Sequence, residues 1–536
     1  MTETSESPDD IAAARASRAV GSGAGADSAG GDSAGGDSAG GDSAGGDSAG
    51  AGEPSIGKKA AGGFAWALVG FALMQVGSFA TYSIATRVLG DEGIGVSATA
   101  LTLVFWIDVL LSVGLGASLI YEQETGQTKR VAVAFTVNLM VAAVLAALCF
   151  FGADTIDRLL GAEHPEMFRV LAALIVVKGL GQVPDAMLKR ELDFKRRVRA
   201  DFTRSIGRFV VTVSLLNAGV GPVSMVIGVL VAEIAAVSVT WFLVRFKPVL
   251  SFDRVVAGQM LRFGAAMFGA QLLGMLWLQG DYFFIAHTWG AKSSEYGSYF
   301  TAFRLPELIL GSAYNLFSNV AFPAYSAARK RGSDALREAS LKSLRYLCFF
   351  GFTASIGMSL IARDFISVLF PDITGAIPIM ELLCVAAGFV GVGYASGDIY
   401  AAIGKPRLGI YFAAVFVPVL FAGFVIAVRH SIIWVAAVHV VVIIPYSAFR
   451  IEVANRLIGT TWRQSLAALR PSAAAVAGLV ALALPVRLLL AQGFGSLIAI
   501  VVAGVVGAGL GLLVGDRAMV REIVAGVVIV RSRFAR

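Results

Sequence analysis

Charged side chains in the middle of long apolar stretches are the residues of this sequence best suited to chemistry. Lys178, Arg208 and Arg304 each stand inside a mainly apolar stretch. A charge near the middle of a bilayer costs roughly 2.5–3.5 kcal/mol on insertion scales, so it normally faces protein or a water-filled cavity. Ammonium and guanidinium groups in such a cleft suit a phosphate or diphosphate ligand. We therefore predict that these three cations contact an anionic headgroup.

Two of these cations also have simpler explanations, which the sequence leaves open. Lys178 can form a structural ion pair with Asp108 or Glu233, which also lie near the middle of predicted helices. Arg208 lies close enough to a helix end to extend its guanidinium into the membrane surface. Asp108 and Glu233 are in turn candidates for proton or Na⁺ coupling, because desolvation favours the neutral form of a buried carboxylate, which then exchanges a proton near neutral pH.

Arg304 and Glu307 form a third candidate pair. They lie three residues apart on one helix face, with Pro306 between them as an expected kink, so they can bind each other or line a cavity. Asp281, at the predicted outer end of its helix, is a further cavity candidate. Asp398, near the predicted inner end of another helix, is better explained as a solvated helix-end residue.

Cysteine and histidine give no sign of a metal site or a redox centre. The three cysteines lie within apolar segments, and neither they nor the four histidines have the spacing of metal ligands. We therefore expect no metal and no cofactor. The residues concerned are Cys149, Cys348, Cys384, His164, His287, His430 and His439.

The composition places these residues in a polytopic membrane protein. Of 536 residues, 57% are hydrophobic and 15% charged, against about a quarter charged in soluble domains. Apolar stretches long enough to cross a bilayer recur along the chain, which predicts an all-α protein with about 14 transmembrane helices. The expected spans are 63–85, 94–120, 131–152, 168–188, 202–218, 222–244, 263–286, 296–322, 341–362, 378–403, 408–428, 432–449, 471–490 and 495–514.

The charges between the helices predict the topology. Gaps that follow even-numbered helices hold 25 Lys and Arg residues and the other gaps hold 8, and seven of the 44 lie in Lys189–Arg204 alone. Since basic loops stay in the cytoplasm, both termini should be cytoplasmic. The Lys189–Arg204 segment is explained by topology, with recruitment of lipid headgroups as the alternative. The outer gaps are too short for a catalytic domain, so we expect a protein that is not an enzyme.

The two ends of the chain differ from the membrane region. Residues 1–60 contain repeats of Gly-Asp-Ser-Ala-Gly with nothing to bury, which predicts a disordered cytoplasmic tail. Asp516–Arg536 places five arginines around an apolar stretch, which predicts an interfacial helix at the cytoplasmic surface.

An internal repeat suggests two halves. Ala85–Gly90, followed by Gly93 and Gly95, is similar to Ala286–Gly290, followed by Gly297, at an offset of six helices. An even offset makes the two units parallel, as in transporters whose halves rock about a central site. The expected domains are 61–250, 251–455 and a remainder at 456–536 that holds the last two helices and the basic tail.

Three stretches give the sequence a family resemblance: Thr86–Gly90 with Asp108, Leu188–Lys195, and Gln279–Tyr282 through Arg304 to Phe322–Ser326. In order and spacing they resemble the O-antigen and exopolysaccharide flippases of the multidrug, oligosaccharidyl-lipid and polysaccharide exporter superfamily. The resemblance also implies that Arg304 faces the cavity. It implies movement of a polyprenyl-diphosphate-linked oligosaccharide from the cytoplasmic to the outer leaflet of a bacterial cytoplasmic membrane.

Three alternatives stay open. One is a small-molecule exporter of the same superfamily, which would favour uncompensated acidic residues in the cleft. Another is a non-transporting component of a glycan assembly complex, which would have polysaccharide assembly proteins as partners. The third is an integral-membrane glycan polymerase, ligase or glycosyltransferase, which would need a sizeable loop or paired acids at a membrane face. Beyond the glycan lipid, membrane lipids are expected as partners, and polysaccharide assembly proteins are a further candidate. The basic residues alternate with apolar segments, which argues against nucleic acid.

Overall fold

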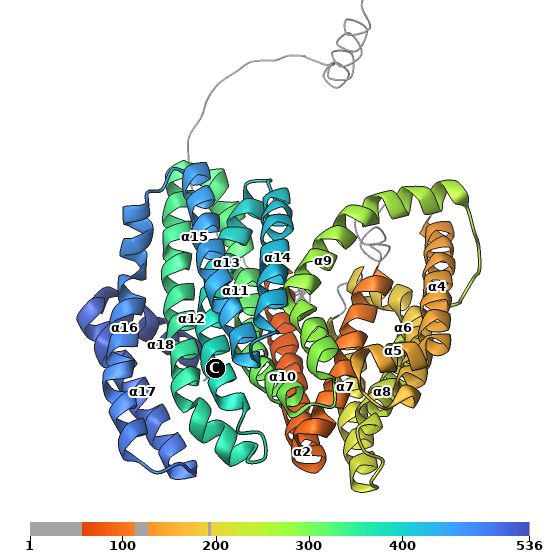
Figure 1. Cartoon of the computed structure of the whole chain (residues 1–536). Coiled ribbons are helices and arrows are strands. Elements are labelled where there is room, and N and C mark those ends of the chain that lie inside the picture. Colours follow the sequence, from red (N-terminus) through yellow and green to blue (C-terminus); the bar gives the residue numbers. More distant parts are fainter. Residues whose placement is uncertain (1–55, 113–126, 191–193, 535–536) are drawn as a thin grey trace, which may run out of the picture. The chain divides into compact units, whose positions relative to one another are not determined.

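The computed structural model describes residues 56–112, 127–190 and 194–534, and this part of the chain is helical with no strand (Figure 1). The prediction for the tail falls mainly on residues outside the described ranges, as does the end of the second predicted span. The first long helix, α2 (Ile56–Ser112), joins the first two predicted spans. Its backbone breaks at Gly90, whose φ of 67° lies in the left-handed region that favours glycine.

The helices that follow fall into two packed groups and a terminal pair. α2 packs with α6, α7 and α8, and α4 packs on α6, which makes a first group. Its other members are α4 (Gln127–Phe151), α5 (Ala153–Leu160), α6 (Pro165–Arg190), α7 (Phe194–Asn217) and α8 (Val223–Val244).

The second group centres on α13 (Ala376–Ala402), which contacts the helices before and after it. Its other members are α9 (Arg254–Trp289), α10 (Ser294–Pro306), the π-helical turn Glu307–Gly311, α11 (Ser312–Arg331), α12 (Ser333–Leu369), α14 (Arg407–Ala427) and α15 (Ile432–Ile458). The terminal pair, α16 (Trp462–Leu489) and α17 (Phe494–Gly515), packs on α12, and α18 (Arg517–Phe534) follows it.

The predicted all-α membrane fold is confirmed. If α2 is taken as two segments about Gly90, and α10 to α11 as one interrupted segment, the described helices supply the fourteen predicted segments. By length and composition alone, ten described helices can cross a membrane. That number is smaller because α2 counts as one helix and because α7, α9 and the interrupted segment α10–α11 are not among the ten.

The structure corrects two local predictions and agrees with a third. Lys189–Arg204 was predicted as a connection, but α7 begins at Phe194, so most of its basic residues are helical. The kink expected at Pro306 is followed by a π-helical turn, Glu307–Gly311, because proline has no N–H to donate within a helix. Asp281 was predicted near a helix end, but α9 continues for two more turns to Trp289, and Asp281 is fully buried.

The connections of the two groups meet in a segment that we call the loop seal: Gly90–Gly95, Leu160–Glu163 and Gly290–Gly297. The Ala291 amide donates to the Leu160 carbonyl at 2.7 Å, and Ser294 donates to Asp91. A Cβ atom added at Gly95 would overlap the carbonyl oxygen of Ala291, and one added at Gly297 would overlap that of Asp91. Both distances would be well below 3.0 Å, closer than real Cβ atoms approach other heavy atoms. The two repeat-related connections therefore touch through backbone at this end of the helices.

Candidate functional site

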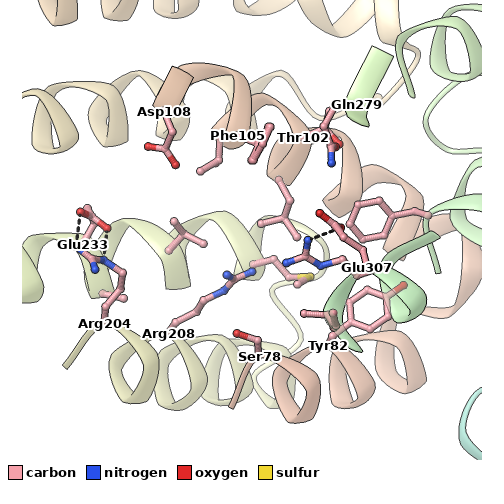
Figure 2. Close-up of a pocket in the computed structure, with 18 of the residues that line it drawn as sticks. Ser78, Tyr82, Thr102, Phe105, Asp108, Arg204, Arg208, Glu233, Gln279 and Glu307 are labelled. Carbon is pink, nitrogen blue, oxygen red and sulfur yellow. Dashed lines mark hydrogen bonds and ion pairs between the residues drawn. The ribbon is translucent and has the colours of Figure 1, made fainter. Parts of the chain in front are cut away.

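A cavity of about 300 Å³ lies between α2, α6, α7, α8, α9 and α10, and we call it the central cavity (Figure 2). Six of the seven candidate residues line it, although they come from six different elements. They are Asp108 on α2, Lys178 on α6, Arg208 on α7, Glu233 on α8, Arg304 on α10 and Glu307 in the π-helical turn. The structure therefore brings together the charged residues that the sequence scatters over 200 positions.

Lys178 and Asp108 form an ion pair in the wall of this cavity. The Lys178 ammonium donates to Asp108 Oδ1 at 2.6 Å, and the Lys178 side chain is only 12% exposed. This is the structural pairing that the sequence left open for Lys178. Removal of Asp108 would leave the Lys178 ammonium in a poorly solvated site.

Glu233 is held by a cation that sequence reasoning missed. Arg204 donates to both carboxylate oxygens of Glu233, at 2.9 and 3.2 Å, and to Asp201 at 2.8 Å. Figure 2 shows this two-pronged pairing beside Arg208. Arg204 had been counted among the loop charges. Its spacing of four residues from Arg208 was the available signal, because such residues share one helix face.

Arg304 and Glu307 pair across the break in the eighth segment. The guanidinium donates to Glu307 Oε2 at 2.9 Å. The break at Pro306 fixes the local backbone, and the wider π-helical turn that follows carries the carboxylate. Turns of this kind are frequent at functional sites. Because both side chains stay partly exposed, the pair remains accessible from the cavity.

Arg208 is the exception among the charged residues of this cavity. Each of the three lining carboxylates binds one lining cation, and Arg208 has no carboxylate partner in the part of the chain that the structure describes. Its Nε is buried and makes no hydrogen bond to a described residue. In Figure 2 the side chain extends between the Arg204–Glu233 pair and Glu307, and no dashed line reaches it. The central cavity therefore carries one uncompensated positive charge, a suitable site for an anion.

Asp281 lies outside the central cavity. Its carboxylate is fully buried and accepts a hydrogen bond from the Tyr299 hydroxyl at 2.6 Å and another from the Tyr282 amide at 3.0 Å. His439 Nε2 on α15 lies 3.1 Å from the same carboxylate. His439 was predicted to be a packed or hydrogen-bonded residue of its helix, and the structure gives it Asp281 as its partner.

A second, larger cavity of about 620 Å³ adjoins the first within the second group, and we call it the aromatic cavity. Arg304, Glu307 and Leu308 line both cavities. Its wall is rich in aromatic rings and includes Asp398 and Arg450. Asp398 was predicted to be a solvated helix-end residue, but its carboxylate accepts a hydrogen bond from Ser318 at 2.6 Å within this wall.

Comparisons with known proteins agree with the fold. The chain is 28% identical over 265 residues to the succinoglycan biosynthesis transport protein ExoT of Rhizobium meliloti (strain 1021). The aligned region covers 48% of this chain and about half, 52%, of that relative.

Solved structures support the same fold. A structure of the lipid II flippase MurJ in an inward closed conformation superposes with a TM-score of 0.69 at 14% identity, covering 85% of this chain and 99% of that one. An inward-facing multidrug resistance MATE family transporter gives a TM-score of 0.60 at 17% identity, covering 72% and 96%. The sequence matches the family described as polysaccharide biosynthesis protein over residues 84–372, more than half of the chain. The protein therefore belongs to the polysaccharide biosynthesis protein family and has the fold of these membrane transporters.

Proposed function

We propose that this protein is a flippase for lipid-linked oligosaccharides, which carries polyprenyl-diphosphate glycans from the cytoplasmic to the outer leaflet for cell-surface polysaccharide synthesis. The observation that carries this proposal is that Arg208, alone among the lining cations, has no carboxylate partner among the described residues. A diphosphate supplies the missing negative charge, and guanidinium binds phosphate through two parallel hydrogen bonds. Lys178 and Arg304 lie in the same wall and would complete the headgroup site by exchanging their carboxylate partners for phosphate.

The loop seal supports alternating access as the mechanism. It joins the two groups at the connections 86–93, 152–164 and 290–293, which the basic-loop pattern assigns to the outside of the cell. A headgroup would then enter from the cytoplasm and leave after the seal opens. An unpaired guanidinium also disfavours the other candidate class, small cationic molecules, because like charges in a shared cavity repel.

A deletion strain tests this function directly in the cell. We expect loss of the protein to leave lipid-linked oligosaccharide on the cytoplasmic leaflet and to remove the corresponding surface glycan. The measurement is mass spectrometry of the extracted lipid-linked pool together with a surface glycan stain. Intact surface glycan with no accumulated pool would remove the flippase proposal.

Asp108 and Glu233 are proposed to couple transport to an ion. Protonation of either carboxylate would release its bound cation, Lys178 or Arg204, toward the substrate. We expect Asp108→Asn and Glu233→Gln to lower transport about tenfold and to flatten its pH dependence, as for loss of a general proton-exchange group. The check is the pH profile of lipid transport in vesicles, with the exposed Asp154→Asn as a matched control. Full transport and an unchanged pH profile in both variants would exclude this role.

A further inference from the structure

We propose that the aromatic cavity binds the sugar units next to the diphosphate. This inference rests on the proposed function, because it assigns the neighbouring headgroup to the central cavity. The two cavities share Arg304, Glu307 and Leu308 in their walls. A polyprenyl-diphosphate glycan also has two adjoining parts, a charged diphosphate and a saccharide. The sugar that is bonded to the diphosphate must lie next to it.

The cavity offers a flat aromatic surface. Trp277 on α9 stacks on Tyr446 on α15, with ring centroids 4.6 Å apart and planes 29° apart, and both rings line the cavity. The Phe416 ring packs edge-on against the Tyr446 ring, with ring centroids 5.1 Å apart, and helps to hold the Tyr446 ring in position. A sugar ring has an apolar face of C–H groups, and a rigid aromatic surface buries such a face without losing much conformational entropy. The volume, about 620 Å³, lies within the range of ligand pockets and leaves room for more than one ring.

Besides the shared Arg304 and Glu307, the same wall holds Asp398 and Arg450. Arg450 Nη1 donates to the Tyr446 hydroxyl at 2.9 Å, and the guanidinium lies over the Tyr446 ring at 5.2 Å. Gly397 makes room for it, since a Cβ there would lie 2.8 Å from Nη2. Asp398 is positioned by Ser318. These contacts hold both groups in place before any ligand arrives.

Unsatisfied polar atoms in this wall restrict the chemistry of the ligand. Asp398 Oδ2 is an acceptor, and Arg450 Nε is a donor; each is buried and has no partner among the described residues. A hydroxyl group can donate to the carboxylate and accept from the guanidinium. Neighbouring hydroxyls on a sugar ring can therefore serve both.

Other occupants leave one of these groups unpaired. An isoprenoid chain would bury both charges against hydrocarbon, at the cost of their solvation. A phosphate would suit Arg450 but face Asp398, and an organic cation would suit Asp398 but face Arg450. A neutral, hydroxyl-rich ring satisfies both and also uses the Trp277–Tyr446 surface. The site therefore suits a saccharide better than a lipid, a phosphate or a cationic drug.

The test compares two probes on the purified full-length protein in lipid nanodiscs. One probe is polyprenyl diphosphate without sugar, and the other is the lipid-linked oligosaccharide pool extracted from a strain that lacks the protein. We expect Trp277→Ala and Asp398→Asn to weaken binding of the glycosylated pool tenfold or more and to leave polyprenyl diphosphate binding unchanged. Arg208→Ala should weaken both probes. Trp277→Phe, which keeps a ring at this position, should recover most of the binding.

Matched controls and distinct outcomes keep the two proposals separate. Trp434→Ala removes an indole outside both cavities and should affect neither probe. Equal weakening of both probes by Trp277→Ala would assign the cavity to the carrier lipid and overturn the saccharide site. Wild-type affinity for the glycosylated pool in folded Trp277→Ala and Asp398→Asn would also overturn it. A wild-type protein that bound neither probe would instead count against the flippase function itself.

Discussion

Replacement of Arg208 by alanine is expected to lower transport of the lipid-linked substrate about 100-fold. Arg208 is the lining cation that no described carboxylate compensates, so its loss removes the net positive charge of the central cavity. Truncation of a desolvated, charge-assisted contact costs about 2–5 kcal/mol, and every 1.4 kcal/mol corresponds to about tenfold. The measurement is the initial rate of lipid transport in vesicles, normalised to the amount of folded protein.

Two further variants separate the charge from the shape of the Arg208 side chain. Arg208→Lys keeps the charge but loses the planar two-pronged donor, so we expect an intermediate rate. Arg199→Ala removes a charge from the exposed face of the same helix and should leave the rate near wild type. Transport at the wild-type rate by Arg208→Ala would remove this residue as a headgroup ligand.

Gly297→Ala is expected to prevent closure of the loop seal and to reduce transport at least tenfold. A Cβ at this position would overlap the backbone oxygen of Asp91, and backbone cannot move aside as a flexible side chain can. We therefore expect the protein to shift toward a conformation in which the first and second helix groups separate at the loop seal. The measurement is the distance between spin labels attached through Glu163→Cys and Lys292→Cys, with and without the Gly297 substitution.

The control for this prediction uses a glycine that has open space around it. Gly509→Ala on α17 meets nothing within 4 Å and should change neither the spin-label distance nor transport. An unchanged distance in Gly297→Ala would show that the seal does not depend on this backbone approach.

The ion pair across the seal should matter much less than its backbone contacts. The Lys292 ammonium lies 2.7 Å from the Glu163 carboxylate and holds the pKa of that carboxyl below its ordinary value. The ion pair therefore persists at neutral pH and is lost only as the pH falls through the lowered pKa. Both side chains are well exposed, and water screens exposed pairs. We therefore expect the glycine contacts, rather than this charge pair, to keep the seal closed.

The sequence predicted the helices and the membership of the central cavity better than the contacts within it. Long apolar stretches have one dominant solution in a membrane, and a charge in such a stretch must face protein or water. For this reason Asp108, Lys178 and Arg304 could be singled out before their positions were known. Which carboxylate pairs with which cation depends on how helices distant in the sequence approach each other, and no local pattern contains that information.

Errors arose where a helix continues past its apolar stretch. Arg204 was counted as a loop charge because hydropathy falls in the first turns of α7, yet the backbone there is already helical. Asp281 was placed near a helix end for the same reason, and the burial of this carboxylate with Tyr299 and His439 depends on α10 and α15. Arg450, counted with a cytoplasmic connection, belongs to α15 and reaches the aromatic cavity.

The most direct measurement is transport by the purified protein in sealed vesicles. The lipid-linked oligosaccharide pool from a deletion strain is placed in both leaflets, and a membrane-impermeant glycosidase then digests what the outer leaflet presents. With the wild-type protein we predict that digestion proceeds to nearly the whole pool, whereas with Arg208→Ala it slows about 100-fold once the outer leaflet is exhausted. Digestion that stops at the same point with wild-type protein and in protein-free vesicles, at any pH or ion gradient, would contradict the account.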